Sequence, residues 1–194
     1  MIVSSSLRAA GTTSVVTEDV VGILSRLMLL PSSDDTRKLS DYAVTNVLYF
    51  KKDILSTASS LLRGAAGLTF SDVQPHVLYC DSLASGLVVS QPELINEEGI
   101  VGYHTVVTST LAADIPVVDD GLIYGMGLLL GGNTDNHSAN SQPANPSFYY
   151  GAGTYDDMRN YLFVVTLFSA DSPISKEADK VLTQSWDVHN ICEL

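Results

Sequence analysis

The feature that most constrains the fold is a stretch of 95 residues, from position 64 to position 158, that contains no Lys or Arg. This stretch carries 11 Asp or Glu residues, and its apolar runs are short and separated by Gly, Pro, Asn and Asp. Runs of this kind are typical of short β-strands joined by turns. We therefore predict that residues 64–170 are mainly β-structure, in an antiparallel or mixed sheet.

Several segments of this region have the residue types and the length of strands. The strand candidates are residues 68–71, 76–80, 86–90, 100–111, 115–118, 122–130 and 148–150. Residues 161–169 form a continuous apolar run, which predicts a central strand because such a strand is covered on both faces. Asp119, Asp120 and Gly121 lie between two candidates and predict a turn.

Helical periodicity is found on both sides of the β region. Residues 17–30 and 33–63 are predicted to be helices, and the second has apolar side chains every three or four positions. Its expected buried stripe is Leu39, Ala43, Val47, Phe50, Ile54, Ala58 and Leu61. A C-terminal helix is expected to begin at Pro173, with Ile174, Ala178, Val181, Leu182 and Trp186 on one face. The predicted fold class is thus α+β, with the sheet packed by a long amphipathic helix from the N-terminal half and by a C-terminal helix.

The length of 194 residues fits a single domain over residues 1–194. We expect residues 1–16 to be an extended arm that packs against the body or a neighbouring chain. Residues 17–63 are expected to be helical, residues 64–170 mainly β, and residues 171–194 a C-terminal helix and tail. A chain of this size needs no disulfide to fold, so Cys80 and Cys192 are expected to be separate thiols rather than a pair.

The charge balance limits the classes of partner. The chain has 10 Lys and Arg against 22 Asp and Glu, and its formal net charge is −12 at pH 7. An acidic surface repels phosphate, so strong nucleic-acid binding is not expected. The longest apolar runs are shorter than the roughly 18–20 residues that span a bilayer, and the first residues do not resemble a secretory signal. We therefore expect no membrane partner.

No pattern in the sequence predicts a particular reaction. The histidines are dispersed and none has zinc-motif spacing; they are His76, His104, His137 and His189. Gly125, Gly127 and Gly131 do not have the spacing of a dinucleotide-binding loop. We therefore predict no catalytic residue, no metal and no cofactor, and we expect a role other than catalysis.

Residues 131–147 form a long neutral polar segment without an apolar anchor, which predicts a loop. Loops of this length in a compact domain are uncommon, and they usually serve a function, form an interface or move. We predict an interface here that includes two tyrosines beyond the loop. The predicted interface residues are Asn133, Asp135, Asn136, His137, Asn140, Asn145, Tyr149 and Tyr150.

In composition, the whole chain resembles structural capsid proteins of non-enveloped viruses, including those of double-stranded RNA viruses. The base-free centre, the polar loop and the absence of a catalytic motif carry this resemblance. It implies a capsid subunit of the virion, assembled in the host cytoplasm from copies of itself and other capsid chains. Unlike many coat proteins of single-stranded RNA viruses, residues 1–16 contain only one basic residue, Arg8. The resemblance therefore does not extend to direct genome packaging.

The alternative is a cytoplasmic α+β enzyme or small-molecule binding domain whose site is assembled from dispersed residues. The candidates for such a site are His104, Asp119, Asp120 and Tyr150. Because the centre of the chain supplies no Lys or Arg, an anion would have to be bound there by neutral donors, a helix end or a metal.

Overall fold

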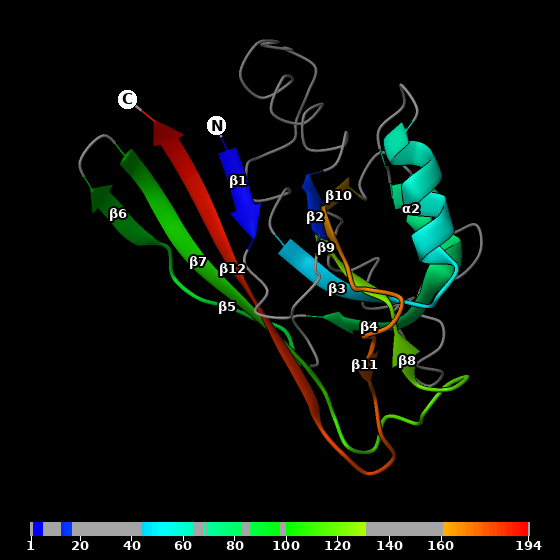
Figure 1. Cartoon of the computed structure of the whole chain (residues 1–194). Coiled ribbons are helices and arrows are strands. Elements are labelled where there is room, and N and C mark those ends of the chain that lie inside the picture. Colours follow the sequence, from blue (N-terminus) through cyan, green and yellow to red (C-terminus); the bar gives the residue numbers. More distant parts are fainter. Residues whose placement is uncertain are drawn as a thin grey trace, which may run out of the picture.

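The computed structural model describes residues 2–5, 13–16, 44–63, 68, 70–82, 86–97, 100–130 and 161–193. These residues form two five-stranded antiparallel sheets and a two-stranded ribbon (Figure 1). The first sheet contains β1 (Ile2–Ser5), β12 (Leu182–Glu193), β7 (Ile100–Leu111) and β5 (Val88–Val89) in this order, and β6 (Glu93–Glu97) also pairs with β7.

The second sheet has the order β2 (Thr13–Val16), β10 (Tyr161–Leu167), β9 (Gly125–Leu130), β3 (Val44–Phe50) and β4 (Val77–Ser82). The ribbon pairs β8 (Leu122–Ile123) with β11 (Ile174–Ser175). The helical elements are α2 (Ile54–Arg63), α3 (Phe70–Val73) and the 3-10 turn η2 (Gln74–His76). Among the described residues, no helix combines the length and the apolar composition needed to cross a bilayer.

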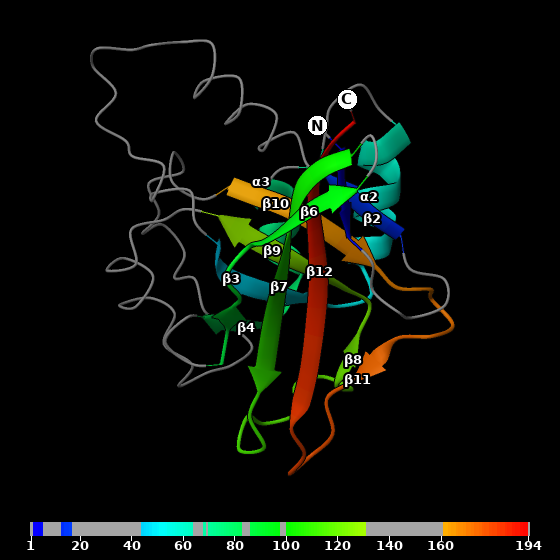
Figure 2. The same cartoon turned by 90° about the vertical axis from the view of Figure 1, so that its left-hand side faces the viewer.

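The strands pair in a nested order along the chain. β1 pairs with β12, β2 with β10, and β3 with β9, so early strands lie beside late ones. The described parts of the N-terminal arm, β1 and β2, thus each add a strand to one of the two sheets. Figure 2 shows the two long strands β7 and β12 side by side along the first sheet.

The second sheet is the middle layer of the molecule because both of its faces are buried. On β3, Val47 and Tyr49 belong to a core cluster shared with Val107 and Trp186 of the first sheet. Their neighbours Leu48 and Phe50 belong to a second cluster with Ile54 of α2. Alternation along one strand therefore places successive side chains in two separate cores.

The predicted long helix over residues 33–63 is wrong. Residues 44–50 form strand β3, and the described helix is limited to Ile54–Arg63. A strand that is buried on both faces is apolar at nearly every position, so some of its residues also match a helical period. Val47 and Phe50 are both fully buried, yet they lie on opposite faces of β3. Leu39, Ala43 and the predicted helix over residues 17–30 lie outside the described residues.

The predicted C-terminal helix is also wrong. Ile174 belongs to the short strand β11, and residues 182–193 pair with β7 along its whole length. Gln184, Trp186 and Val188 alternate with Thr183, Ser185 and Asp187, which is the period of a strand with one buried face. Trp186 is fully buried, and its indole N–H donates to Thr166 Oγ1 at 3.2 Å. The described part of the chain is therefore mostly β, and the α+β class with long helices is not correct.

The strand predictions were more successful in the centre of the chain. Strand β7 matches the predicted residues 100–111, and β10 matches most of residues 161–169. The turn at Asp119–Asp120–Gly121 is confirmed by a hydrogen bond from the Gly121 N–H to the Val118 carbonyl at 2.9 Å. Predicted strands at 68–71 and 115–118 are wrong, since α3 begins at Phe70 and residues 115–118 form no strand. Strand β6 was not predicted, and residues 148–150 lie outside the described residues.

Candidate functional site

The interface predicted in the polar loop remains a prediction, because all eight of its residues lie outside the described ranges. These residues are Asn133, Asp135, Asn136, His137, Asn140, Asn145, Tyr149 and Tyr150. The structure does describe a different surface with the properties of an interface, at the edge of the first sheet.

Exposed apolar side chains gather on the first sheet. Of the six large apolar side chains that are exposed among the described residues, four belong to strands β5, β6 and β7. Leu94 of β6 is 61% exposed, and Tyr103 and Val101 of β7 are 51% and 38% exposed. We call these three residues the β6–β7 patch. Leu94 lies directly opposite Tyr103 in the strand register, and Val101 is two residues from Tyr103 on the same face.

The geometry of the two sheets explains why the β6–β7 patch is exposed. Tyr103 lies on the same face of β7 as Val107 and Leu111, both of which are 1% exposed in the core between the sheets. In Figure 1 the sheets lie close together at one end and diverge toward β6. The patch therefore lies on the core-facing side of the first sheet, but at the end where the described strands of the second sheet do not cover it.

The patch adjoins an unpaired strand edge. β6 pairs with β7, and no described strand pairs with its other edge. A free edge presents backbone N–H and C=O groups that can pair with a strand from another chain. An apolar patch and a free strand edge on the same two strands form a surface suited to protein contacts.

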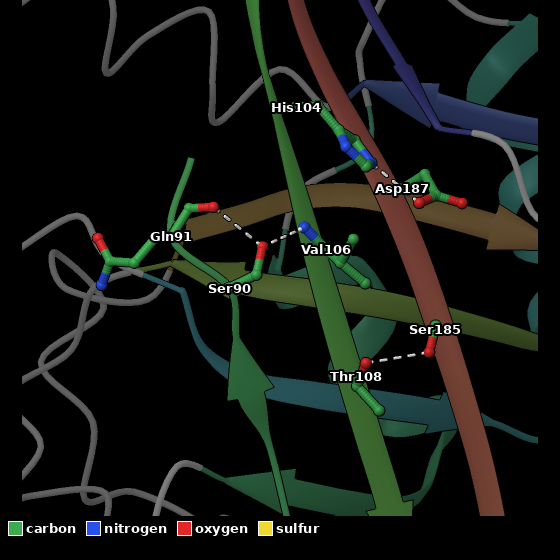
Figure 3. A network of polar contacts seen from close by, with 7 residues as sticks. All are labelled: Ser90, Gln91, His104, Val106, Thr108, Ser185 and Asp187. Atoms are coloured by element: carbon green, nitrogen blue, oxygen red, sulfur yellow. Dashed lines mark hydrogen bonds and ion pairs between the residues drawn. The ribbon is translucent and has the colours of Figure 1, made fainter. Parts of the chain in front are cut away.

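The opposite face of β7 and β12 carries several polar contacts (Figure 3). His104 Nε2 lies 3.0 Å from Asp187 Oδ1, and the His104 ring stacks on the His189 ring with 4.7 Å between centroids. Glu93 of β6 lies opposite His104 in the register. Further along the sheet, Thr108 Oγ1 lies 3.0 Å from Ser185 Oγ.

Strand β7 also receives a side-chain contact from the segment that follows β5. Ser90 Oγ accepts a hydrogen bond from the Val106 N–H at 2.9 Å and donates to the Gln91 carbonyl at 3.2 Å (Figure 3). Ser90 therefore holds the edge segment against β7, which positions the beginning of β6.

The pairing of His104 with His189 could not be predicted from the spacing of the histidines. The two residues are far apart in sequence and meet because the register of β7 and β12 places them opposite each other. Among the described residues, no group of three or more His, Cys, Asp or Glu has an arrangement that could hold a metal ion. The two imidazoles and Asp187 form a polar surface cluster.

The residues proposed for an alternative site do not form one site in the described structure. His104 contacts Asp187 and His189, whereas Asp119 and Asp120 line a cleft with Lys51 and Lys52. Tyr150 lies outside the described residues.

The buried polar residues between the sheets have a structural role. Asp81 of β4 is 1% exposed and accepts hydrogen bonds from Ser109 Oγ at 2.7 Å and from the Thr110 N–H at 2.9 Å. Its other oxygen accepts from the Gly86 N–H at 2.8 Å. Tyr49 OH lies 2.6 Å from Ser109 Oγ, and burial raises the pKa of Tyr49 above its ordinary value. Asp81 therefore ties the second sheet to the first.

The fold and the exposed edge together define a class of protein. The described chain is a two-sheet antiparallel β protein that has a helix against the outer face of the second sheet and an uncovered apolar patch on the first. Comparison with known protein families, with curated proteins and with solved structures found no match in any of the three.

Proposed function

We propose that this chain is a structural subunit of a large assembly, namely a virus capsid shell or a capsid-associated protein. It acts through protein–protein interfaces with copies of itself and with other capsid chains. The observation that carries the proposal is the β6–β7 patch, in which Leu94 and Tyr103 are more than half exposed beside the unpaired edge of β6.

Leaving this apolar patch exposed to water costs free energy, which favours its burial in an interface. Burying apolar surface contributes about 25 cal/mol per Å². Leu94 and Tyr103 are direct cross-strand neighbours, so one partner surface can cover both side chains. Tyrosine is enriched at interface hot spots because it offers a large apolar ring with a polar end.

The capsid part of the proposal rests on the compositional resemblance of the chain. Double-sheet β domains occur in viral capsids and also in lectins, so the architecture is compatible with a capsid but does not select it. The net charge of −12 supports contacts with protein rather than with nucleic acid.

The net charge also sets a condition for self-association. Two copies that each carry a charge of −12 repel one another at neutral pH. Dissolved salt screens this repulsion over a Debye length of about 10 Å at 0.1 M. The free energy gained from apolar contacts at the β6–β7 patch must therefore exceed the free energy of repulsion between the copies. This repulsion weakens as salt is added.

The chain offers a matched pair of variants to test the patch. Leu94 is 61% exposed on the patch, and Val181 is 58% exposed outside it, just before β12. We expect Leu94→Ser to weaken self-association by about tenfold or more, as measured by light scattering after size exclusion, because hot-spot truncations cost about 2 kcal/mol. Val181→Ser should leave association unchanged. Equal effects of the two variants would argue against the patch as the interface.

A further inference from the structure

A small cleft with charges of both signs lies away from the β6–β7 patch. It has a volume of about 260 Å³ and lies between the segment that follows β3 and the turn that precedes β8. Two lysines, three aspartates and three largely apolar residues line it: Lys51, Lys52, Asp53, Asp119, Asp120, Leu78, Leu122 and Tyr124. In the sequence the two lysines are separated from the base-free stretch by Asp53 and helix α2, and the fold places them in one cleft with Asp119 and Asp120 of that stretch.

The lysines are held on one side of the cleft by neighbouring groups. Lys52 Nζ lies 5.7 Å from the centroid of the Tyr124 ring, within the range of a cation–π contact. Lys51 Nζ lies 3.8 Å from Asp53 Oδ2. The two segments that bound the cleft are joined by a hydrogen bond from the Tyr124 N–H to the Phe50 carbonyl at 2.9 Å.

The turn that carries the aspartates is fixed by several hydrogen bonds. The Val118 N–H donates to Tyr79 OH at 2.8 Å, and Asp120 Oδ1 accepts from the Leu122 N–H at 2.9 Å. Asp119 has a φ of 53°, in the left-handed region that non-glycine residues seldom adopt. Such strained residues are frequent at ligand sites, and a turn that is already ordered loses little entropy on binding.

The size and the charges of the cleft restrict its ligand. Sites for drug-sized molecules usually have volumes of about 300–1,000 Å³, so this cleft suits a smaller molecule than a nucleotide or a large cofactor. A simple anion would meet the carboxylates of Asp53, Asp119 and Asp120, and a simple cation would meet the ammonium groups of Lys51 and Lys52. A molecule with both charges avoids either conflict, and the apolar atoms of Leu78, Leu122 and Tyr124 can cover a small apolar side chain.

We propose that this cleft binds a zwitterionic small molecule of the amino-acid class. The ligand carboxylate lies toward Lys52, and its ammonium group lies toward Asp119. Because ionic contacts at an exposed site are individually weak, binding is expected in the millimolar range. This site is separate from the β6–β7 patch, so its test does not depend on the proposed assembly function.

The test is an NMR titration of the labelled full chain with three related probes at constant ionic strength. The probes are L-valine, isovalerate, which lacks the amino group of valine, and isobutylamine, which lacks its carboxylate. We expect saturable shifts of the backbone amides of residues 51–53 and 119–124 with L-valine and at least fivefold weaker binding of the other two. The proposal would be overturned if L-valine gave no saturable shifts up to roughly 50 mM, a concentration above the expected millimolar dissociation constant. Equal binding of all three probes would also overturn it.

Two near-isosteric variants identify the groups responsible. Lys52→Gln and Asp119→Asn should each weaken L-valine binding by fivefold or more. Lys180→Gln and Asp171→Asn remove the same charges at exposed positions outside the cleft and should leave binding unchanged. The spectrum of each variant also reports whether the chain is folded. If a folded Lys52→Gln or Asp119→Asn variant binds L-valine as the wild type does, the assigned site is wrong.

Discussion

At the scale of single residues, Phe50 packs its ring directly on the backbone of a neighbouring strand. A Cβ atom added at Gly127 of β9 would lie 3.1 Å from Cε2 and Cζ of Phe50, closer than such atoms normally approach. At Gly125, which is opposite Phe50 in the register, a Cβ atom would lie 3.2 Å from Leu167 Cδ2. The two glycines, which do not have nucleotide-loop spacing, are therefore explained by packing.

We predict that Phe50→Ala lowers the free energy of unfolding by about 3–5 kcal/mol, because the ring is fully buried and leaves a cavity. Chemical denaturation monitored by circular dichroism measures this change. Val181→Ala, at an exposed position, should cost less than about 0.5 kcal/mol. A loss below about 1 kcal/mol for Phe50→Ala would show that β3 is not the centre of two cores.

Asp81 is a second residue whose replacement should destabilise the fold. Replacing Asp81 with Ala leaves the Ser109 hydroxyl and the Gly86 and Thr110 N–H groups without this acceptor. An unsatisfied buried group costs about 1–3 kcal/mol, so Asp81→Ala should destabilise the fold by at least about 3 kcal/mol. Asp171→Ala at an exposed position is the control for denaturation measurements. Equal stabilities of the two variants would contradict the role of Asp81 between the sheets.

Burial also predicts how stability depends on pH. It raises the pKa of the Cys80 thiol and the pKa of the Tyr49 hydroxyl. The unfolded chain therefore ionises first, near the ordinary values of about 8.5 for Cys and 10 for Tyr. The stabilisation is complete below these values and is lost as the pH rises through them toward the higher folded-state values.

We accordingly expect the free energy of unfolding to fall between about pH 8.5 and pH 11, by up to about 1.4 kcal/mol per pH unit for each group. Urea denaturation at a series of pH values measures this slope. Cys80→Ser keeps an acceptor for the Asn46 amide, which donates to the Cys80 sulfur at 3.3 Å, but removes the thiol titration. The early part of the decline should be absent in this variant. A wild-type stability that stays constant to pH 11 would contradict the raised pKa values of both groups.

At the scale of elements, a strand was predictable where its residues do not also match a helical period. Strands β7 and β10 were predicted because each is a continuous run with strong β-formers and clear turn signals. Strand β3 also has apolar side chains on both faces, but Val47, Phe50 and Ile54 recur at a helical spacing, which favours the wrong interpretation. Strand β12 shows a two-residue alternation around Trp186, but Pro173 and a partial helical period favoured the wrong interpretation.

The candidate site was less predictable than the strands. Tyr103 and Val107 have the same orientation on β7, yet one is exposed and the other buried. This difference depends on where the two sheets diverge, which strand propensities do not encode. The contact of His104 with His189 depends on strand register, which is likewise set by distant pairing.

The polar segment over residues 131–147 is predicted from the sequence to form an interface, and shortening it tests this role. Replacing it with a short Gly/Ser linker should leave the chain folded and weaken assembly, because long loops of this type often form interfaces. Circular dichroism reports the fold, and light scattering reports the mass of the assembly. Insertion of a Gly/Ser segment at residues 112–114, an exposed connection after β7, is a control for altered chain length. Unchanged assembly after shortening would count against an interface in this segment.

At the scale of the whole molecule, the nested pairing brings together strands from opposite ends of the chain. β1 and β2 complete the two sheets by pairing with β12 and β10. This arrangement leaves the edge of β6 and the adjoining apolar patch as the described surface best suited to another chain. The acidic charge of the molecule opposes association of copies, so the balance between apolar contact and repulsion depends on salt.

The central claim, that the chain is a subunit which associates through protein contacts, is tested most directly by sedimentation of the purified chain. Runs over a wide concentration range at about 0.1 M and about 0.5 M salt compare strong and weak repulsion. We predict that the average mass rises with concentration and rises further at the higher salt. A mass that equals the 20.8 kDa monomer at every concentration and both salt levels would contradict the claim.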